Sequence, residues 1–446
     1  FVYPGFYDGH CHFLGYGLNL RQADLTGTRS FDEIIIRLKE YKKSNNARWI
    51  VGRGWDQNDW ENPSFPSKEQ LDALFPSHPV FLTRIDGHAA LVNSVALDIA
   101  GITKETTVKG GQVLMDENGP TGILIDKAID LVQSKIPEPG WDEKKKALLD
   151  AQENCFDVGL TSVADAGLEL EDIRIIQAMH NDSSLKMRIY GMLSPGKENI
   201  EQIVKKGKIQ TTRLTVSSIK LYADGALGSR GALLLEPYTD DPGNIGLQMY
   251  EHDYYRNLCN LAYTHDFQVN THCIGDSANR LILNIYADFL KEKNDRRWRI
   301  EHAQIVNPDD LHKFSDYSII PSVQTTHATS DMYWANERLS DNRMEGPYAY
   351  KQLLGFYAAV ARKDVKGYPA EGFQMANKLT REQALRAMTI WPARAAFEEK
   401  FKGSLEPGKV ADFVVFNEDL MKISLSEIPL LHVQQTYVDG KKVYSR

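Results

Sequence analysis

The sequence has few cysteines, no long apolar stretch and no excess of basic residues, and each of these absences excludes a class of protein. Only four of the 446 residues are cysteines, and no two form a Cys-x-x-Cys pair, so free thiols are predicted at Cys11, Cys155, Cys259 and Cys273. No apolar run reaches the roughly 18 residues that a membrane span needs. A formal net charge of −8 gives no basic footprint for nucleic acid. We therefore expect a globular protein with a small-molecule substrate.

The chain also lacks an initiator methionine and a signal peptide, because it begins at Phe1. We expect further residues upstream of this point. For the same reason the sequence leaves two alternatives for the cellular location of the protein, the cytoplasm and export.

The first chemical signal is a pair of histidines near the start. Residues 4–13 read as a short apolar strand that leaves a Pro-Gly turn and ends on His10 and His12. Alternate residues of a strand face the same side, so one cation could accept both imidazoles, which suit zinc and similar metals. The alternative is a chance pair of surface histidines.

Residues 20–140 mix short strands with amphipathic helices. The apolar spacing predicts a helix over 31–43, and 49–52 and 79–83 read as strands. Asp86-Gly87-His88 follows the second of these strands and suits either a substrate pocket or a solvated turn. His88 could also cap a helix predicted over 89–97.

After Trp141 the pattern changes to alternating strands and helices, which favours a parallel sheet. At least six such units favour a closed (β/α)8 barrel. Helices are predicted over 143–158, 173–180, 254–265 and 277–293, and strands over 159–165, 186–191, 214–222, 268–272, 298–302 and 318–323. The last part differs: a helix over 387–397 precedes strands over 411–416 and 436–444, with Asp439-Gly440 as a hairpin turn.

Polar side chains stand at the carboxyl ends of several predicted strands, where (β/α)8 barrels carry their chemistry. Besides the opening pair these are Lys220, His272 and His302. Each has an alternative: Lys220 as a surface lysine, His272 as a core histidine and His302 as a surface partner of Glu301. Their joint placement favours one polar site.

Several longer motifs resemble the amidohydrolase superfamily, within it the metal-dependent amidohydrolases related to N-substituted formamide deformylases. They are Pro-Gly-Phe-Tyr-Asp-Gly-His-Cys-His from Pro4, Thr-Arg-Ile-Asp-Gly-His-Ala-Ala-Leu-Val-Asn-Ser from Thr83, Ile-Lys-Leu-Tyr-Ala-Asp-Gly-Ala-Leu-Gly-Ser-Arg-Gly-Ala from Ile219, Thr-His-Cys-Ile-Gly-Asp from Thr271, Arg-Ile-Glu-His-Ala-Gln from Arg299 and Gly-Ser-Leu-Glu-Pro-Gly-Lys-Val-Ala-Asp from Gly403. They span nearly the whole chain in the expected order.

The resemblance implies a site that holds one or two divalent metal ions, with zinc expected. Lys220 would be carboxylated and bridge the ions, which would activate a water as hydroxide near neutral pH. The implied metal ligands are His10, His12, Lys220, His272 and His302. The implied substrate-binding residues are His88, Asp224 and Arg230. Asp224 could instead cap a turn, and Arg230 could form a structural ion pair.

One part of the family pattern is missing. The resemblance implies a metal-binding, proton-shuttling aspartate at the end of an eighth strand, and we find none, so the catalytic residue stays unassigned. Only Gly355 separates a predicted helix over 348–354 from one over 356–360. Either the printed sequence lacks a segment between Leu354 and Gly355, or the strand is truly deleted and the protein is a relative with impaired catalytic activity.

The sequence therefore predicts an α/β protein with a distorted (β/α)8 barrel over 1–400, an inserted α/β segment over 20–140, and the C-terminal part of a small β-sandwich over 401–446. The expected function is metal-dependent hydrolysis of a C–N bond in an amide, formamide or cyclic amide. The alternatives are an esterase or deaminase on the same scaffold, or a non-catalytic metal-binding regulator. A homodimer is left open.

Overall fold

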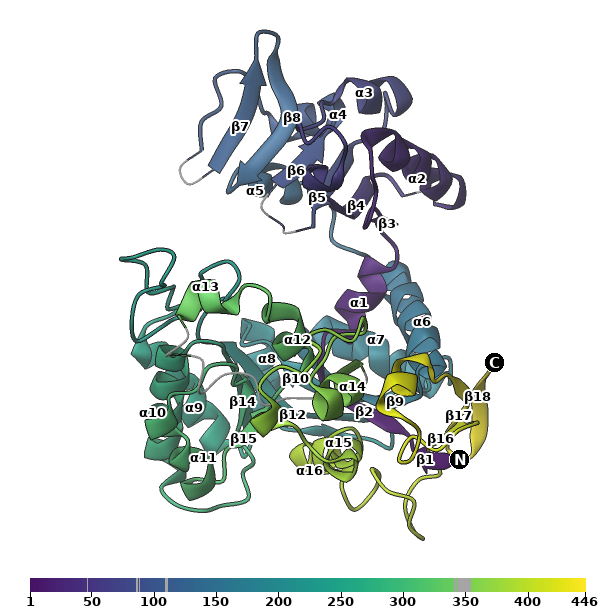
Figure 1. The fold of residues 1–446 in the computed structure, drawn as a ribbon, viewed down its shortest axis with the longest axis vertical. Coiled ribbons are helices and arrows are strands. Elements are labelled where there is room, and N and C mark those ends of the chain that lie inside the picture. Colours follow the sequence, from purple (N-terminus) through teal and green to yellow (C-terminus); the bar gives the residue numbers. More distant parts are fainter. Residues whose placement is uncertain (46, 86, 88, 109–110, 341–342, 344–353) are drawn as a thin grey trace. The chain divides into compact units, whose positions relative to one another are not determined.

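The computed structural model describes residues 1–45, 47–85, 87, 89–108, 111–340, 343 and 354–446 (Figure 1). Two compact units divide the chain. One contains Phe1–Leu14 and Leu148–Arg446, and the other is Gly15–Ala147. The second unit includes the insertion predicted over 20–140.

The larger unit is built on a sheet of seven parallel strands, which form a nearly closed barrel. Their order across the sheet is their order in the chain, as repeated strand–helix units predict. The strands are β2 (Phe6–Cys11), β9 (Leu160–Leu168), β10 (Arg188–Leu193), β12 (Leu214–Tyr222), β13 (Gln268–Cys273), β14 (Arg299–His302) and β15 (Ile320–Ser322). A short strand, β11 (Ile209–Gln210), pairs antiparallel with β12. The predicted barrel class is confirmed.

Helices follow most of these strands, and several of them bury an apolar face. In α10 (Asp276–Leu290), for example, Ile282, Tyr286 and Leu290 lie about one turn apart and are buried, while Lys291 ends the helix. The other helices are α1 (Phe13–Asn19), α6 (Trp141–Asp157), α7 (Leu170–Asn181), α8 (Lys197–Lys206), α9 (His252–Thr264), α11 (His312–Asp316), α12 (Thr326–Asp331) and α13 (Ala335–Leu339). No helix in the described ranges is long and apolar enough to cross a membrane.

The parallel sheet ends at β2 on one side and at β15 on the other. In the described part of the chain, no eighth parallel strand closes the gap. The two helices predicted on either side of Gly355 were partly wrong, because α14 (Leu354–Ala361) runs through this glycine without a break. A single glycine costs a helix only about 1 kcal/mol. Residues 348–353 of the predicted helix lie outside the described residues.

The single helix predicted over 387–397 was also wrong. The chain forms α15 (Arg381–Ala387) and then α16 (Ile390–Ala395). Thr389, between them, has φ −138° and ψ −87°, which is not helical. Pro392 lies in the first turn of α16, where a missing N–H is tolerated.

Both ends of the chain meet in a four-stranded antiparallel sheet. Its order is β1 (Val2–Pro4), β16 (Phe413–Phe416), β17 (Val433–Val438) and β18 (Lys441–Ser445). The predicted hairpin is present: Asp439 and Gly440 both have positive φ, 52° and 71°, as a two-residue type I′ turn requires. The residues from Val2 to Pro4 thus belong to this small sheet rather than to the barrel.

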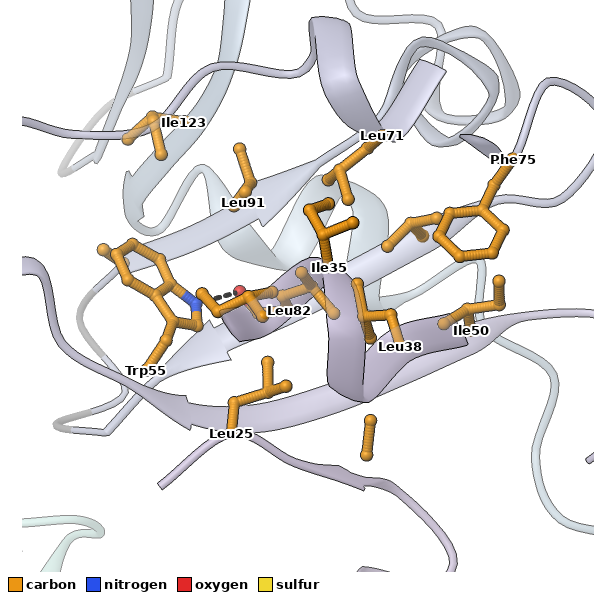
Figure 2. Close-up of a cluster of buried hydrophobic side chains, with 14 of the residues drawn as sticks. Leu25, Ile35, Leu38, Ile50, Trp55, Leu71, Phe75, Leu82, Leu91 and Ile123 are labelled. Carbon is orange, nitrogen blue, oxygen red and sulfur yellow. Dashed lines mark hydrogen bonds between the residues drawn. The ribbon is translucent and has the colours of Figure 1, made fainter. Parts of the chain in front are cut away.

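The inserted unit has its own mixed six-stranded sheet and its own core. The strand order is β3 (Ala23–Asp24), β4 (Ile50–Trp55), β5 (Val80–Arg84), β6 (Ala89–Val92), β8 (Gly119–Asp126) and β7 (Gly111–Asp116). Its helices are α2 (Phe31–Ser44), α3 (Glu69–Leu74), α4 (Ser94–Ala100) and α5 (Ile129–Gln133). Figure 2 shows the core between α2 and the sheet, where the Trp55 indole N–H donates to the Leu82 carbonyl at 2.9 Å.

The helix predicted over 89–97 was wrong, because its first half is strand β6 and only α4 is helical. Ala89–Val92 is fully buried between neighbouring strands, and Asn93 caps α4 by accepting from the Ala96 N–H. His88 lies outside the described residues, so its predicted role stays a prediction. The four cysteines are free thiols, as predicted.

Candidate metal centre

The carboxyl ends of four barrel strands bring all five predicted metal ligands of this chain together. His10 lies in β2 and His12 just after it, Lys220 in β12, His272 in β13 and His302 at the end of β14. The imidazole ring of His302 lies 4.8 Å from that of His10 and 4.6 Å from that of His272. The rings of His10 and His12 are 5.7 Å apart. Strands that are far apart in sequence thus supply one cluster.

Three of these imidazoles are held through their Nδ1 atoms. His10 Nδ1 lies 2.5 Å from Glu301 Oε2, and His12 Nδ1 lies 2.9 Å from the Ala166 carbonyl. His302 Nδ1 lies 2.5 Å from Gln324 Oε1. A carboxylate, a carbonyl and an amide oxygen each accept hydrogen bonds, so Nδ1 is the donor in each ring. Each Nε2 then keeps a lone pair, which is how metal-binding histidines are usually held.

His272 presents its Nε2 in a different way. This atom is buried and has no hydrogen-bond partner among the described residues, and it lies 3.6 Å from Asp224 Oδ1. A buried nitrogen without a partner is costly unless something else binds it. The Asp224 carboxylate is itself occupied, since it accepts from the N–H groups of Leu233, Ile274 and Gly275.

The structure shows the turn contacts that the sequence left as the alternative for Asp224. It organises the turns after β12 and β13, and it also borders His272. Burial raises its pKa to about 7, although the three backbone N–H groups act in the opposite direction. Its substrate-binding role stays a prediction.

The Lys220 amine is fully buried at the centre of the cluster. Its Nζ lies 3.4 Å from His10 Nε2. No carboxylate of the described residues forms an ion pair with it, and burial lowers its pKa to about 8. A buried amine without an anionic partner is unusual, because a buried charge is costly unless it is paired.

The histidines are uncharged at neutral pH. Burial, opposed by the Glu301 carboxylate, lowers the pKa of His10 to about 4. Burial and the nearby Lys220 lower the pKa of His272 to about 3. Burial also lowers the pKa of His12, and that of His302 falls well below its ordinary value. Neutral imidazole is the form that binds metal.

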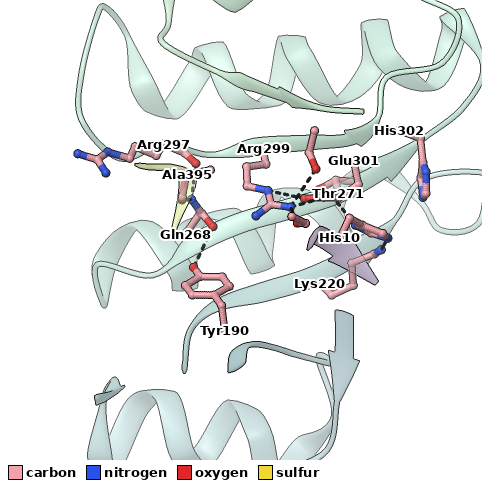
Figure 3. Close-up of polar contacts among 12 residues, drawn as sticks. His10, Tyr190, Lys220, Gln268, Thr271, Arg297, Arg299, Glu301, His302 and Ala395 are labelled. Carbon is pink, nitrogen blue, oxygen red and sulfur yellow. Dashed lines mark hydrogen bonds and ion pairs between the residues drawn. The ribbon is translucent and has the colours of Figure 1, made fainter. Parts of the chain in front are cut away.

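A buried ion pair, which the sequence reasoning missed, supports His10. Arg299 Nε lies 2.6 Å from Glu301 Oε1, and the same guanidinium donates to the Gly9 carbonyl at 2.6 Å (Figure 3). Burial alone would raise the pKa of Glu301, but Arg299 and His10 hold it well below its ordinary value. The Arg299–Glu301–His10 chain therefore fixes the orientation of His10. The only sequence signal for this support was that Arg299 and Glu301 alternate along one strand, which places them on the same face.

Two further side chains near the cluster were not predicted. Asp165, in β9, accepts from the N–H groups of Phe13 and Leu14 and so fixes the turn that follows His12. His327, in α12, has its ring 5.8 Å from that of His302. No motif marks these residues.

Arg230 is engaged away from the cluster. Its guanidinium donates to the Asp240 carboxylate at 2.8 and 3.2 Å, and Arg338 contacts the same carboxylate. This is the ion pair that the sequence left as the alternative for Arg230. Its substrate-binding role stays a prediction.

The donor set fits a transition-metal centre. As the side chains stand, no three His, Cys, Asp or Glu residues of the described ranges are close enough to hold an ion together. The four imidazoles are nevertheless neutral, and the His272 Nε2 has no partner. Imidazole nitrogen suits zinc, and the buried amine of Lys220 would suit it after carboxylation.

The fold is of the (β/α)8 type with histidines at its strand ends, and comparison with known proteins gives the family. The amidohydrolase family model matches residues 1–444, and the chain belongs to this family. It is 31% identical to the putative amidohydrolase YtcJ of Bacillus subtilis, over the whole chain and 89% of the relative. It is 33% identical to the protein LONG AFTER FAR-RED 3 of Arabidopsis thaliana, over 99% of the chain and 82% of the relative.

A solved structure and a third relative extend the comparison. An uncharacterized metal-dependent hydrolase from Pyrococcus horikoshii OT3 is 28% identical, with a TM-score of 0.80 over 95% of this chain and 87% of that one. The N-substituted formamide deformylase of Arthrobacter pascens is 24% identical over 100% of the chain and 88% of the relative. The alignment with YtcJ runs over 481 positions, more than the 446 residues here, so YtcJ has residues without a counterpart in this chain.

Proposed function

We propose that this chain is a metal-dependent hydrolase that cleaves a C–N bond in an amide, a formamide or a cyclic amide. The observation that carries the proposal is the set of inward-facing Nε2 atoms at the strand ends. His10, His12 and His302 are each held through Nδ1, and the Nε2 of His272 is buried without a partner. The unpartnered Nε2 of His272, and the Nε2 of His10 beside the buried Lys220 amine, support a bound ligand at this point.

The residues that would hold the metal are His10, His12, His272, His302 and Lys220. A bound divalent ion, with zinc as our expectation, would polarise the substrate carbonyl and lower the pKa of a water from 15.7 towards about 7. The chain's own part is to keep the imidazoles neutral and fixed. Burial keeps these imidazoles neutral, while the Arg299–Glu301 pair fixes the orientation of His10 and Gln324 fixes that of His302.

Carboxylation of Lys220 would complete the ligand set. The amine would add to carbon dioxide, lose a proton and become a carbamate, which is an anion able to bridge two ions. Only a neutral amine can do this, and the pKa of about 8 makes the neutral form accessible near pH 7. The buried site also has no other anion paired with Lys220 among the described residues.

Asp224 and His88 are the residues that would contact the substrate. Asp224 borders His272 and could accept a hydrogen bond from a substrate N–H. His88 would donate a hydrogen bond to the oxygen that becomes negative during attack, a contact that typically gives about 10²–10³ in kcat. The formamide option draws on the likeness to the deformylase, whose own substrate class its name states.

The test is hydrolysis by the full chain loaded with Zn²⁺, against N-substituted formamides, simple amides and cyclic amides. Matched p-nitrophenyl esters and an aminopyrimidine separate the esterase and deaminase alternatives. We expect turnover of at least one C–N substrate, lost when His10 and His12 are both replaced by alanine. Full metal content in that double variant, by elemental analysis, would refute the ligand assignment.

One observation favours a second candidate, a metal-binding protein without catalytic activity. The described part of the barrel has no eighth strand, and that strand would carry the aspartate that the family resemblance implies. Zinc bound at full occupancy, with no turnover of any substrate in the panel, would support this candidate. Turnover above that of metal-free protein would exclude it.

A further inference from the structure

The segment that follows β15, the last barrel strand, contacts His302 through two residues. Gln324 accepts a hydrogen bond from His302 Nδ1 at 2.5 Å. Three residues later, the ring of His327 lies 5.8 Å from the His302 ring, at an interplanar angle of 77°. One short stretch of chain therefore both orients His302 and places another imidazole beside it.

The distance between these two rings matches that of the predicted ligand pair. The His10 and His12 rings, which share one face of β2, are 5.7 Å apart with an interplanar angle of 90°. With metal–nitrogen distances of about 2.0–2.1 Å, two imidazoles on one ion have ring centres roughly this far apart. The His302–His327 pair thus has the spacing that a shared ion needs.

The position of His327 is fixed by its own helix. Asp331, four residues along, lies on the same face of α12 and is buried. Its carboxylate accepts from Gln304 Nε2 at 2.8 Å and from Ser330 Oγ at 2.7 Å. Since Gln304 follows His302 by two residues, this bond ties α12 to the end of β14.

His327 also follows the strand at which the described parallel sheet ends. In the described part of the barrel, the sheet stops at β15, so no eighth strand supplies an aspartate. His327 comes from the segment directly after β15. Its side chain is of a metal-binding type, and its ring borders that of the predicted ligand His302.

We propose that His327 is a fifth imidazole ligand of the metal centre, and that it completes the coordination of an ion held by His272 and His302. This inference rests on the metal centre proposed above. It assigns to this chain a ligand that none of the motifs marks.

The experiment measures metal binding rather than turnover. Full-length protein is stripped with a chelator and titrated with Co²⁺ alone, and bound Co²⁺ is followed by elemental analysis and by its visible absorption bands. In His327→Ala we expect at least about tenfold weaker binding of one ion and a changed band pattern, since even supporting residues contribute 10–100-fold. His327→Asp, which restores a ligand atom, should recover much of the affinity.

A matched control is His312→Ala, because His312 is exposed in α11 and should bind Co²⁺ like the wild type. His327→Asn serves if the alanine variant misfolds, with circular dichroism as the check on folding. Wild-type Co²⁺ affinity and spectrum in folded His327→Ala and His327→Asn would overturn the proposal, including the case in which turnover alone falls.

The His10→Ala/His12→Ala variant separates the two proposals. If that variant loses Co²⁺ while His327→Ala does not, only the role of His327 fails. If neither variant loses Co²⁺, the metal centre itself fails.

Discussion

Two buried lysines lie at opposite ends of the barrel strands, each with its Nζ over a tyrosine ring, but among the described residues only Lys402 forms an ion pair with a carboxylate. Lys402 packs over the Tyr7 ring near the start of β2, and its Nζ lies 2.7 Å from the Glu398 carboxylate. Glu398 also accepts from Tyr7 Oη at 3.1 Å and from Thr215 Oγ1 at 2.9 Å. Lys220, at the carboxyl ends, has only a histidine nitrogen within hydrogen-bond distance among the described residues.

The difference separates a structural site from a functional one. A buried charge with a paired, hydrogen-bonded partner is part of the folded framework, whereas a buried amine without an anion is a cost that folding alone does not explain. Barrel enzymes carry stability at the amino ends of the strands and chemistry at the carboxyl ends. The two lysines of this chain follow that division.

The largest expected effect on stability comes from Lys402→Ala. It leaves the Glu398 carboxylate buried without its cation, which typically costs about 3–5 kcal/mol. Urea unfolding should show this loss, while metal content stays at the wild-type level. A double replacement, Lys402→Met with Glu398→Leu, should recover most of the stability. Loss of metal in Lys402→Ala would contradict the assignment of Lys402 to a purely structural role.

Lys220→Ala should have the opposite profile. We expect little loss of stability, because no ion pair is removed, but a fall of at least about 10²–10³-fold in turnover, since a metal centre contributes several kcal/mol. A small carboxylic acid should partly restore the activity by replacing the carbamate. Wild-type turnover in this variant would discard the bridging role.

A smaller effect is expected from Glu301→Gln, which weakens the support of His10. Metal affinity should fall about 10–100-fold. The pH dependence of unfolding provides a second measurement. Because the folded pKa of Glu301 lies well below its ordinary value of 4.5, its carboxylate stabilises the fold above about pH 4.5, and this contribution is lost as the pH falls through the folded pKa. The variant should therefore lose less stability than the wild type on acidification. Equal acid sensitivity in both proteins would contradict this.

The smallest effect is expected from Arg230→Ala. Its guanidinium forms an exposed ion pair with Asp240, and such pairs contribute little. The unfolding midpoint and metal content should not change, and kcat/KM should stay within about threefold. A tenfold rise in KM, with Asp240→Ala as the control, would instead support a substrate contact.

The sequence was sufficient to predict which metal-binding types of side chain stand at strand ends. Lys220, His272 and His302 each stand at the end of an apolar strand, and parallel strands bring such ends to one edge. The supporting residues could not be predicted, because Glu301 and Gln324 act through contacts with side chains far away in sequence. His327 lies in a short helix without strand periodicity, so only its packing against His302 reveals it. The strand β6 was missed because apolar periodicity does not separate short buried strands from helices.

By itself, the sequence determined the alternation of strands and helices, and with it which side chains stand at strand ends, because side-chain periodicity is a local property of the backbone. Only the tertiary structure decided which nitrogen of each histidine is free, which buried lysine has a carboxylate partner and where the sheet stops. Tautomer, pKa and ion pairing depend on burial and on neighbours from distant parts of the chain. The sequence marked Lys220 by its place at a strand end, but only the assembled barrel shows that Lys220 is buried beside a histidine nitrogen and that Lys402 is buried beside Glu398.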